Sequence, residues 1–100
     1  MNIGDTKTKR VATKEDLGLQ IVILQRGWVM VGRLYRRGYE CELHKASVIR
    51  AWGTTKGLGE IASNGPTVNT KLDPCGDEVV RFHYMTVVAS IGCREDKWEK

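Results

Sequence analysis

The segment between residues 26 and 52 combines two kinds of side chain that together can hold a nucleotide. Aromatic rings stack on nucleobases, and arginine guanidinium groups pair with phosphate oxygens in a bidentate manner. We expect at most two of these rings to contact a ligand, because Tyr39 is expected in the core and Trp52 can fill the interior of a small barrel. The interleaved residues are Arg26, Trp28, Arg33, Tyr35, Arg36, Arg37, Tyr39, Arg50 and Trp52.

The turn that follows this segment offers a second arrangement able to bind an anion. Residues 53–57 supply backbone N–H groups, two threonine hydroxyls and one lysine at the expected start of a helix. An ordinary strand-to-helix turn has the same composition, so both interpretations stay open. Together the two features give the candidate ligand-binding residues Arg33, Arg36, Arg50, Trp52, Thr54, Thr55 and Lys56.

Residue patterns typical of enzymes are missing from the sequence. It contains neither a Gly-x-x-x-x-Gly-Lys phosphate loop nor a Gly-x-Ser-x-Gly nucleophile turn. His44 and His83 fall on the polar side of alternating strands and are expected at the surface. The acidic residues at positions 73, 77 and 78 adjoin Pro74 and Gly76, which favours a solvated turn over a metal site. We therefore expect a protein that is not an enzyme and that has no cofactor and no bound metal.

Length, charge and cysteine content indicate a small single-domain protein of the cytoplasm. One hundred residues, of which 41% are apolar, can form one packed core. The net charge of +4 favours anionic partners, although a basic face that only keeps the protein in solution gives the same balance. Three cysteines without a Cys-x-x-Cys pair indicate reduced thiols. No apolar run is long enough for a bilayer, and the first ten residues lack the apolar core of a secretion signal.

Apolar periodicity predicts a mainly β, small α+β fold. Strands are expected at residues 19–24, 28–35, 39–44 and 46–52, with a tight turn at 36–38. Leu58, Ile61 and Ala62 have helical spacing, and Gly65 ends the expected short helix. A loop or an irregular edge is expected at 67–76 and β-structure again at 79–91. These elements divide the chain into a flexible lead-in (1–18), one domain (19–93) and a charged tail (94–100).

The stretch from Ile21 to Cys93 resembles an uncharacterised family of small phage and prophage proteins. A step of Gly-x-Leu form at residues 32–34, a late step at residues 88–93 and a central run with a short helix carry the resemblance. Two basic residues of the family pattern are replaced by Ser47 and Val48, and Arg50 stands where the family tends to have an aromatic residue. The matching positions of the central run are Ala46, Ile49, Trp52, Leu58, Ile61, Ala62 and Gly65.

The order of the expected strands is similar to that of SH3-like and Sm-like small β-barrels. The similar features are a bent strand with a central glycine, a tight hairpin and an alternating strand. This likeness implies a small barrel with one short helix between the fourth and fifth strands. By analogy with Sm-like proteins, it also implies a homo-oligomer, with a ring as one possible form.

These expectations lead to a non-catalytic phage-type protein that sequesters a small nucleotide-type signalling molecule and thereby counters host defence. A cyclic nucleotide or an ADP-ribose derivative is the expected ligand, and the host cell cytoplasm is the expected location. An Sm-like accessory protein that binds RNA or DNA is the first alternative. The second alternative is a phage protein that binds a host protein, with Trp28 and Trp98 as exposed anchors. No membrane partner is expected.

Overall fold

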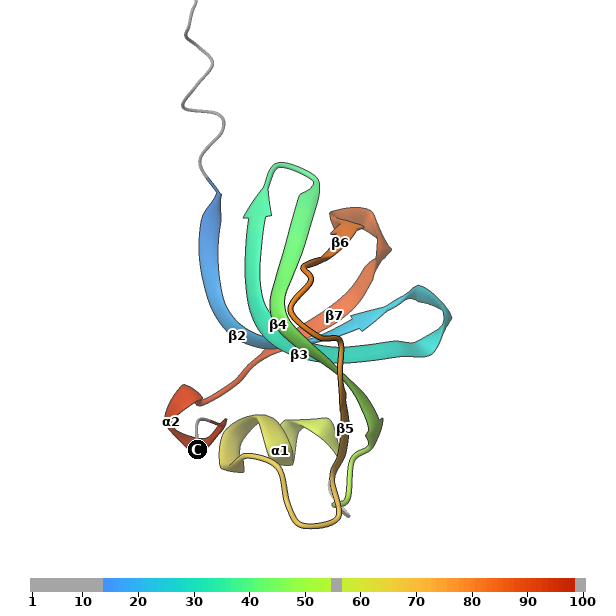
Figure 1. The fold of residues 1–100 in the computed structure, drawn as a ribbon, viewed down its shortest axis with the longest axis vertical. Coiled ribbons are helices and arrows are strands. Elements are labelled where there is room, and N and C mark those ends of the chain that lie inside the picture. The colour runs from blue at the N-terminus through green and yellow to red at the C-terminus, as the bar shows by residue number, and fades with distance from the viewer. Residues whose placement is uncertain (1–13, 55–56, 99–100) are drawn as a thin grey trace, which may run out of the picture.

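The structure is a computed structural model that describes residues 14–54 and 57–98. The described strands form an antiparallel sheet in the order β5-β4-β3-β2-β7, and β6 also pairs with β4 (Figure 1). The mainly β class expected from the sequence is confirmed. The strands are β2 (Glu15–Leu24), β3 (Trp28–Arg37), β4 (Glu40–Ala51), β5 (Lys71–Pro74), β6 (Val80–His83) and β7 (Val87–Gly92).

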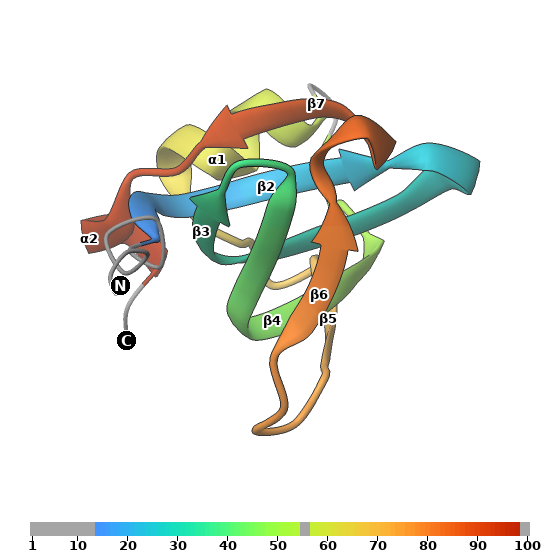
Figure 2. The same cartoon turned by 90° about the horizontal axis from the view of Figure 1, so that it is seen from above.

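The long strand β4 pairs with β3 on one side and divides its other side between β6 and β5. Cys41 pairs with Phe82 of β6, whereas Val48 pairs with Asp73 of β5. From β6 the chain crosses through a 3-10 turn, η3 (Tyr84–Thr86), to β7 at the opposite edge, beside β2 (Figure 2). Within the part of the chain that the structure describes, β7 does not pair with β5 or β6. The sheet is therefore open, and the closed barrel expected from the sequence is not confirmed.

Both faces of the sheet are packed, which explains the consecutive apolar residues of its central strands. Ile21 and Val22 are neighbours in β2 and are fully buried, yet they belong to different clusters because successive side chains point to opposite faces. The first cluster contains Ile21, Val31, Ile49, Leu58, Ile61 and Ala62. The second contains Val22, Met30, Leu34, Cys41, Leu43 and Ala46.

Two short helices cover part of the first cluster. The helix α1 (Leu58–Asn64) confirms the expected helix and buries Leu58 and Ile61 against the sheet. The second helix, α2 (Glu95–Trp98), lies in the segment expected as a charged tail, where no helix was expected. It packs beside α1 because Trp98 contacts the first cluster and the Arg94 N–H donates to the carbonyl of Ala62 at 2.9 Å.

The strand β4 is continuous where two separate strands were expected. Lys45 interrupts its regular backbone with a φ of 52°, and the pairing with β3 skips a position between Val31 and Arg33. A β-carbon at Gly32 would lie 2.8 Å from the His44 carbonyl oxygen, so only glycine lets β3 approach β4 at this point. The polar break in the sequence pattern at residue 45 is therefore a bend within one strand.

The sheet also extends beyond the expected boundaries. Strand β2 begins at Glu15, before the expected start of the domain at residue 19, and β5 lies in a segment expected as a loop or an irregular edge. The first thirteen residues of the expected lead-in lie outside the described residues. Of the helices in the described part of the chain, none is long and apolar enough to cross a membrane.

Candidate functional site

A hollow of about 300 Å³ at the start of β3 brings together one tryptophan and two arginines. We call it the Trp28 pocket. Arg26, Gly27, Trp28 and Val29 line it from the end of β2 and the start of β3, and Val48, Ile49 and Arg50 line it from β4. The Trp28 ring is 52% exposed. An exposed ring between residues that carry guanidinium groups is suited to a planar ligand that also bears negative charge.

The register of the sheet explains why Trp28 and Arg50 share this pocket. Met30 pairs with Val48 across β3 and β4, and Trp28 and Arg50 each lie two residues beyond that pair. Because side chains alternate along a strand, both residues point to the face of the second cluster, at its rim. The sequence therefore positions the ring and one cation through the same pairing that forms the core.

The second cation of the pocket is held by an unusual turn. Arg26 lies in η2 (Gln25–Gly27), which joins β2 to β3, and has a φ of 69°. This left-handed backbone costs a residue other than glycine about 1–2 kcal/mol. Among the described residues, Arg26 and Lys45 are the non-glycine positions with positive φ, and each lines a hollow. Backbone strain of this kind concentrates at binding sites.

Arg50 is paired, but in a way that a ligand can replace. Its Nη2 and Nε lie 2.9 and 3.2 Å from Oδ2 of Asp73 on β5. Both side chains are more than half exposed, and exposed pairs of this kind contribute only about 0–1 kcal/mol. A phosphate oxygen can therefore compete with Asp73 for this guanidinium group. The Arg26 side chain makes no hydrogen bond or ion pair within the part of the chain that the structure describes.

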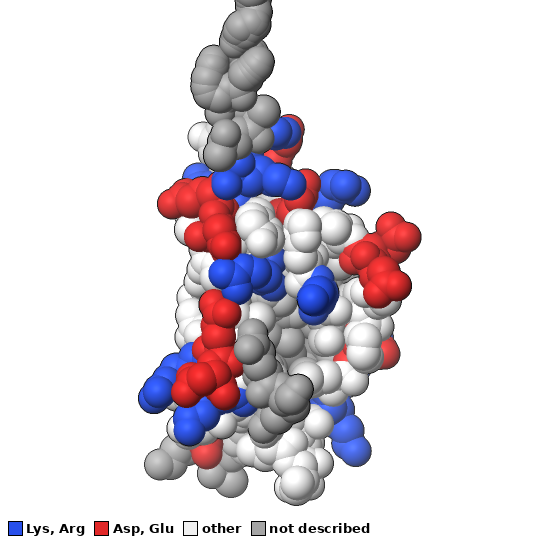
Figure 3. All heavy atoms as spheres, turned by 60° about the vertical axis from the view of Figure 1, so that its left-hand side comes forward, with Lys and Arg blue, Asp and Glu red and all other residues white. Residues whose placement is uncertain are grey.

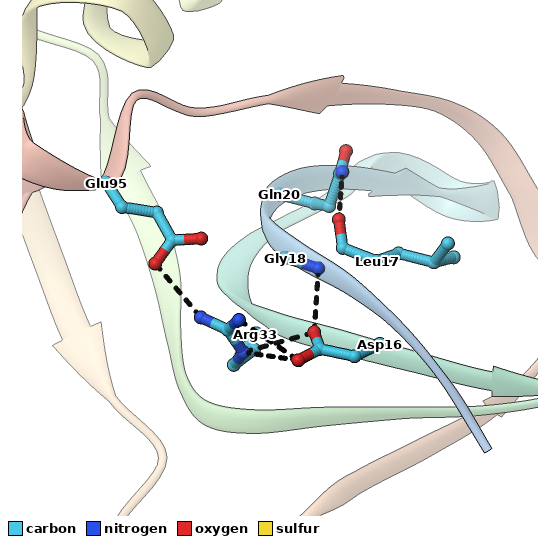
Figure 4. Close-up of polar contacts among 6 residues, drawn as sticks. All are labelled: Asp16, Leu17, Gly18, Gln20, Arg33 and Glu95. Carbon is cyan, nitrogen blue, oxygen red and sulfur yellow. Dashed lines mark hydrogen bonds and ion pairs between the residues drawn. The ribbon is translucent and has the colours of Figure 1, made fainter. Parts of the chain in front are cut away.

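Arg33, another candidate from the sequence, forms intramolecular ion pairs with two carboxylates (Figure 4). Its Nε and Nη2 donate to the carboxylate of Asp16 on β2 at 3.0–3.2 Å, and its Nη1 donates to Glu95 of α2 at 2.9 Å. The Arg33 hydrogen bonds, together with one from the Gly18 N–H, hold the pKa of Asp16 below its usual range. With three of its donor groups engaged, Arg33 links β2, β3 and α2.

Arg36 lies at the other end of β3, far along the strand from Trp28. Its guanidinium carbon lies 3.5 Å from the centre of the Tyr84 ring, and its Nε donates to the Gly38 carbonyl at 2.7 Å. The Tyr84 N–H donates to the carbonyl of Tyr39, whose ring stacks on His83 at a centroid distance of 5.2 Å. Tyr39 is 60% exposed, so the expectation that it lies in the core is wrong.

The remaining candidates lie around the end of β4. Trp52 is 44% exposed and does not fill the interior of the sheet. The Thr54 hydroxyl accepts a hydrogen bond from the Gly57 N–H at 2.9 Å, which uses one backbone donor that was expected to face an anion. Thr55 and Lys56 lie outside the described residues. Of the described residues that were selected from the sequence, Arg50 is the one that lines the Trp28 pocket.

A larger groove of about 930 Å³ lies near Arg33, between β3, β4 and α2, but its charges are balanced. Arg33 and Lys45 line it together with Asp77 and Glu95. On this side of the molecule, acidic and basic side chains alternate and do not form a patch of one sign (Figure 3). This groove is therefore a poorer anion site than the smaller Trp28 pocket.

Glu42 forms a second ionic cluster beside this groove. Its carboxylate accepts hydrogen bonds from Lys14 at 2.6 Å and from His44 at 2.9 Å. The Lys14 contact, followed by the His44 contact, lowers the pKa of Glu42 to about 2. The Tyr35 ring packs against His44 with centroids 4.6 Å apart. The side chains of Lys14, Tyr35, Glu42 and His44 therefore contact one another on this face.

Sequence reasoning named Arg26 and Trp28 among the interleaved residues but did not select them as a site. The signal that could have found them is their place on either side of Gly27, at a hairpin connection. Trp98 was expected to be an exposed anchor, and that expectation is wrong. It is partly buried against the first cluster, and its indole N–H lies 3.4 Å from the Ala62 carbonyl.

Comparisons with known proteins give this chain no relative. A scan against protein-family models, a search of curated proteins and a search of solved structures each found no match.

Proposed function

We propose that this chain is a non-catalytic binding protein for a small nucleotide-type anion and that the Trp28 pocket is its binding site. The observation that supports this most directly is the exposed Trp28 ring in a hollow lined by Arg26 and Arg50. Its volume of about 300 Å³ lies at the lower end of the range for small-molecule pockets and suits one nucleotide unit.

The chemistry of recognition follows from the three side chains. The indole ring stacks on the base, which contributes about 1–3 kcal/mol and tolerates different bases. The Arg26 and Arg50 guanidinium groups pair with phosphate oxygens, and such charge-assisted hydrogen bonds contribute about 1.5–3 kcal/mol each. A ligand with one planar ring and one or two phosphate groups uses all three contacts.

The resemblance of the sequence to small phage and prophage proteins supplies the biological setting of the proposal. A phage-type protein that binds such a molecule without altering it would keep a nucleotide signal, such as a cyclic nucleotide or an ADP-ribose derivative, from a host receptor. We also propose that the open sheet has the strand arrangement of an SH3-like or Sm-like barrel, because the chain crosses between the sheet edges through η3.

Calorimetric titration with cyclic dinucleotides, nucleoside monophosphates and ADP-ribose tests the proposal. Trp28→Ala is expected to weaken binding about 5- to 150-fold, the equivalent of about 1–3 kcal/mol. Asp73→Asn removes the competing carboxylate and one negative charge, so it is expected to strengthen binding about 2- to 10-fold. A ligand recovered intact after heat denaturation supports sequestration.

The matched control is Trp52→Ala, because Trp52 is an exposed tryptophan that does not line the pocket. It is expected to bind as the unaltered protein does. No binding across the panel, or equal loss of binding in the Trp28 and Trp52 variants, would refute the proposal. Cleaved ligand would show an enzyme instead.

A second candidate function, binding of single-stranded nucleic acid, is favoured by the aromatic cluster at the far end of β3. There Arg36 covers the Tyr84 ring, and the exposed Tyr39 ring stacks on His83. Stacked rings beside arginines are the elements of a surface that binds successive bases. This candidate requires contacts to several phosphates at once, which distinguishes it from a pocket for one small ligand.

A further inference from the structure

The outer edge of β7 is an exposed strand edge that carries no further strand within the described residues. Figure 2 shows β7 as the outermost strand of the sheet beside β2, joined at its start to the end of β6 through η3. Of the described strands, only β2 pairs with β7. Three consecutive residues, Val88, Ala89 and Ser90, are exposed, so neither face of the strand is covered there. The backbone groups on its outer side are therefore open to a further strand.

The composition of β7 favours the addition of a strand. Residues 87–92 have the sequence Val-Val-Ala-Ser-Ile-Gly, with no charged residue and no proline. Val88 is 66% exposed, and so is Met85 of η3, which directly precedes the strand. Most edge strands avoid association by means of lysine, proline, inward-pointing charges or a β-bulge. Strand β7 has no charged residue and no proline, but its register against β2 shifts at Val88, between the pairs Ile23–Ala89 and Leu24–Val87.

The opposite edge of the sheet carries the charged residues and the proline that β7 lacks. Strand β5 carries Lys71, Asp73 and Pro74, and the proline cannot donate a ladder hydrogen bond. Strand β6 carries Arg81 and His83 and is only four residues long. A head-to-tail assembly would have to pair β7 with this charged and interrupted edge. The pairing that involves no charged residue and no proline joins β7 to β7.

We propose that β7 binds the β7 strand of a second copy of this chain, antiparallel and around a two-fold axis, to form a dimer with a continuous sheet. In this arrangement the uncharged β7 strand of one copy lies beside the uncharged β7 strand of the other, so no charged side chain is buried. With the axis at Ala89, the centre of the exposed run, Val88 of one copy lies beside Ser90 of the second. The proposal is independent of the Trp28 pocket and replaces the ring that the Sm-like strand order suggested.

Sedimentation equilibrium over a range of protein concentrations tests the proposal. We expect a mass twice the 11.3 kDa of one chain. Because an interface of six residues per copy is small, the dissociation constant is expected to be on the order of 10 μM. The double variant Val88→Lys/Ser90→Lys adds the charges that natural edges use, and it is expected to be a monomer at about 200 μM. Both substituted side chains are exposed, so the fold should persist, which circular dichroism checks.

Val68→Lys provides the control, because Val68 is 96% exposed and lies in the turn before β5. It is expected to dimerise like the unaltered chain. Amide hydrogen exchange of residues 87–92 should slow as the concentration of the unaltered protein rises, and it should not slow in the double variant. A monomer at about 200 μM, a mass above that of two chains, or a dimer that survives both lysines would each overturn the proposal.

Discussion

At the scale of single residues, the backbone and the side chain of Arg26 have opposite requirements. Its φ of 69° would suit glycine, yet the residue carries one of the two guanidinium groups of the Trp28 pocket. Gly27 also has a positive φ, of 81°, so the chain makes two left-handed residues in succession between β2 and β3. Retaining a long basic side chain at a strained position suggests that the guanidinium group has a use other than stability.

The variant Arg26→Gly separates these two requirements. We expect the free energy of unfolding to rise by up to about 1 kcal/mol, because the relief of left-handed strain exceeds the greater chain entropy of glycine in the unfolded state. Nucleotide affinity should fall with the loss of the guanidinium group. Urea denaturation and calorimetric titration measure the two effects.

Arg26→Ala is the matched control for this prediction. It loses the same guanidinium group but keeps a β-carbon at the strained position, so its affinity should fall equally without a gain in stability. If both variants were destabilised to the same extent, the strain at residue 26 would have no energetic consequence. If both bound the ligand normally, Arg26 would have no part in recognition.

At the scale of elements, sequence periodicity predicts most of the sheet but not how its strands join. The runs around Ile21 and Val31 are apolar on both sides because both faces of the sheet are covered, and they read as strands. The helix at Leu58–Asn64 follows from its apolar spacing. Local patterns could not show that the expected third and fourth strands are one strand, because the bend at Lys45 depends on the close approach of Gly32.

Elements that depend on distant contacts were also missed. Strand β5 is short and polar, and it pairs with β4 through residues such as Leu72 opposite Ile49. The helix α2 is a single turn, which is too short to be stable by itself. It depends on the packing of Trp98 on the first cluster, and this contact is not visible in the sequence pattern. For the same reason the Trp28 pocket could not be assembled from spacing alone, since Arg50 reaches it only through the register of β3 and β4.

The attachment of α2 allows apolar packing and ion pairing to be compared. Trp98 packs on the first cluster, whereas Glu95 contributes an ion pair to Arg33 in which both side chains are 40% exposed. We expect Trp98→Ala to lower the free energy of unfolding by about 2–3 kcal/mol, somewhat less than for a fully buried tryptophan. Glu95→Gln should cost less than about 1 kcal/mol, because Arg33 keeps its bonds to Asp16.

Chemical denaturation of the two variants measures this difference, with Asp96→Asn as a control for charge on the same helix. The Asp96 contact to Arg94 is long, at 3.6 Å, and both side chains are largely exposed. Its removal should leave stability nearly unchanged. A larger loss for Glu95→Gln than for Trp98→Ala would mean that the Arg33 network, and not the apolar contact, holds α2 to the sheet.

At the scale of the whole molecule, several of the described basic side chains lie in small neutralised groups. The net charge is +4, yet Arg33, Arg50 and Lys14 each pair with a carboxylate. The mixed surface of Figure 3 reflects this pairing. On the face that Figure 3 shows, the described residues form no continuous positive track of the kind along which a nucleic acid backbone usually lies. On that face the distribution favours a small ligand over a polymer.

The salt dependence of binding distinguishes a small nucleotide ligand from a nucleic acid. If the Trp28 pocket holds a small nucleotide through two guanidinium groups, raising the salt from about 50 to 200 mM should weaken binding less than about threefold, because few counterions are displaced. A single-stranded oligonucleotide held by three or more phosphate contacts around Tyr39 and Arg36 should show a slope of log K against log salt of about −2 or steeper.

Titrating the protein with a nucleoside monophosphate and with a twelve-nucleotide oligomer at each salt concentration compares the two directly. A steep slope that Tyr39→Ala reduces and Trp28→Ala leaves unchanged would make nucleic acid binding at the far end of β3 the main activity.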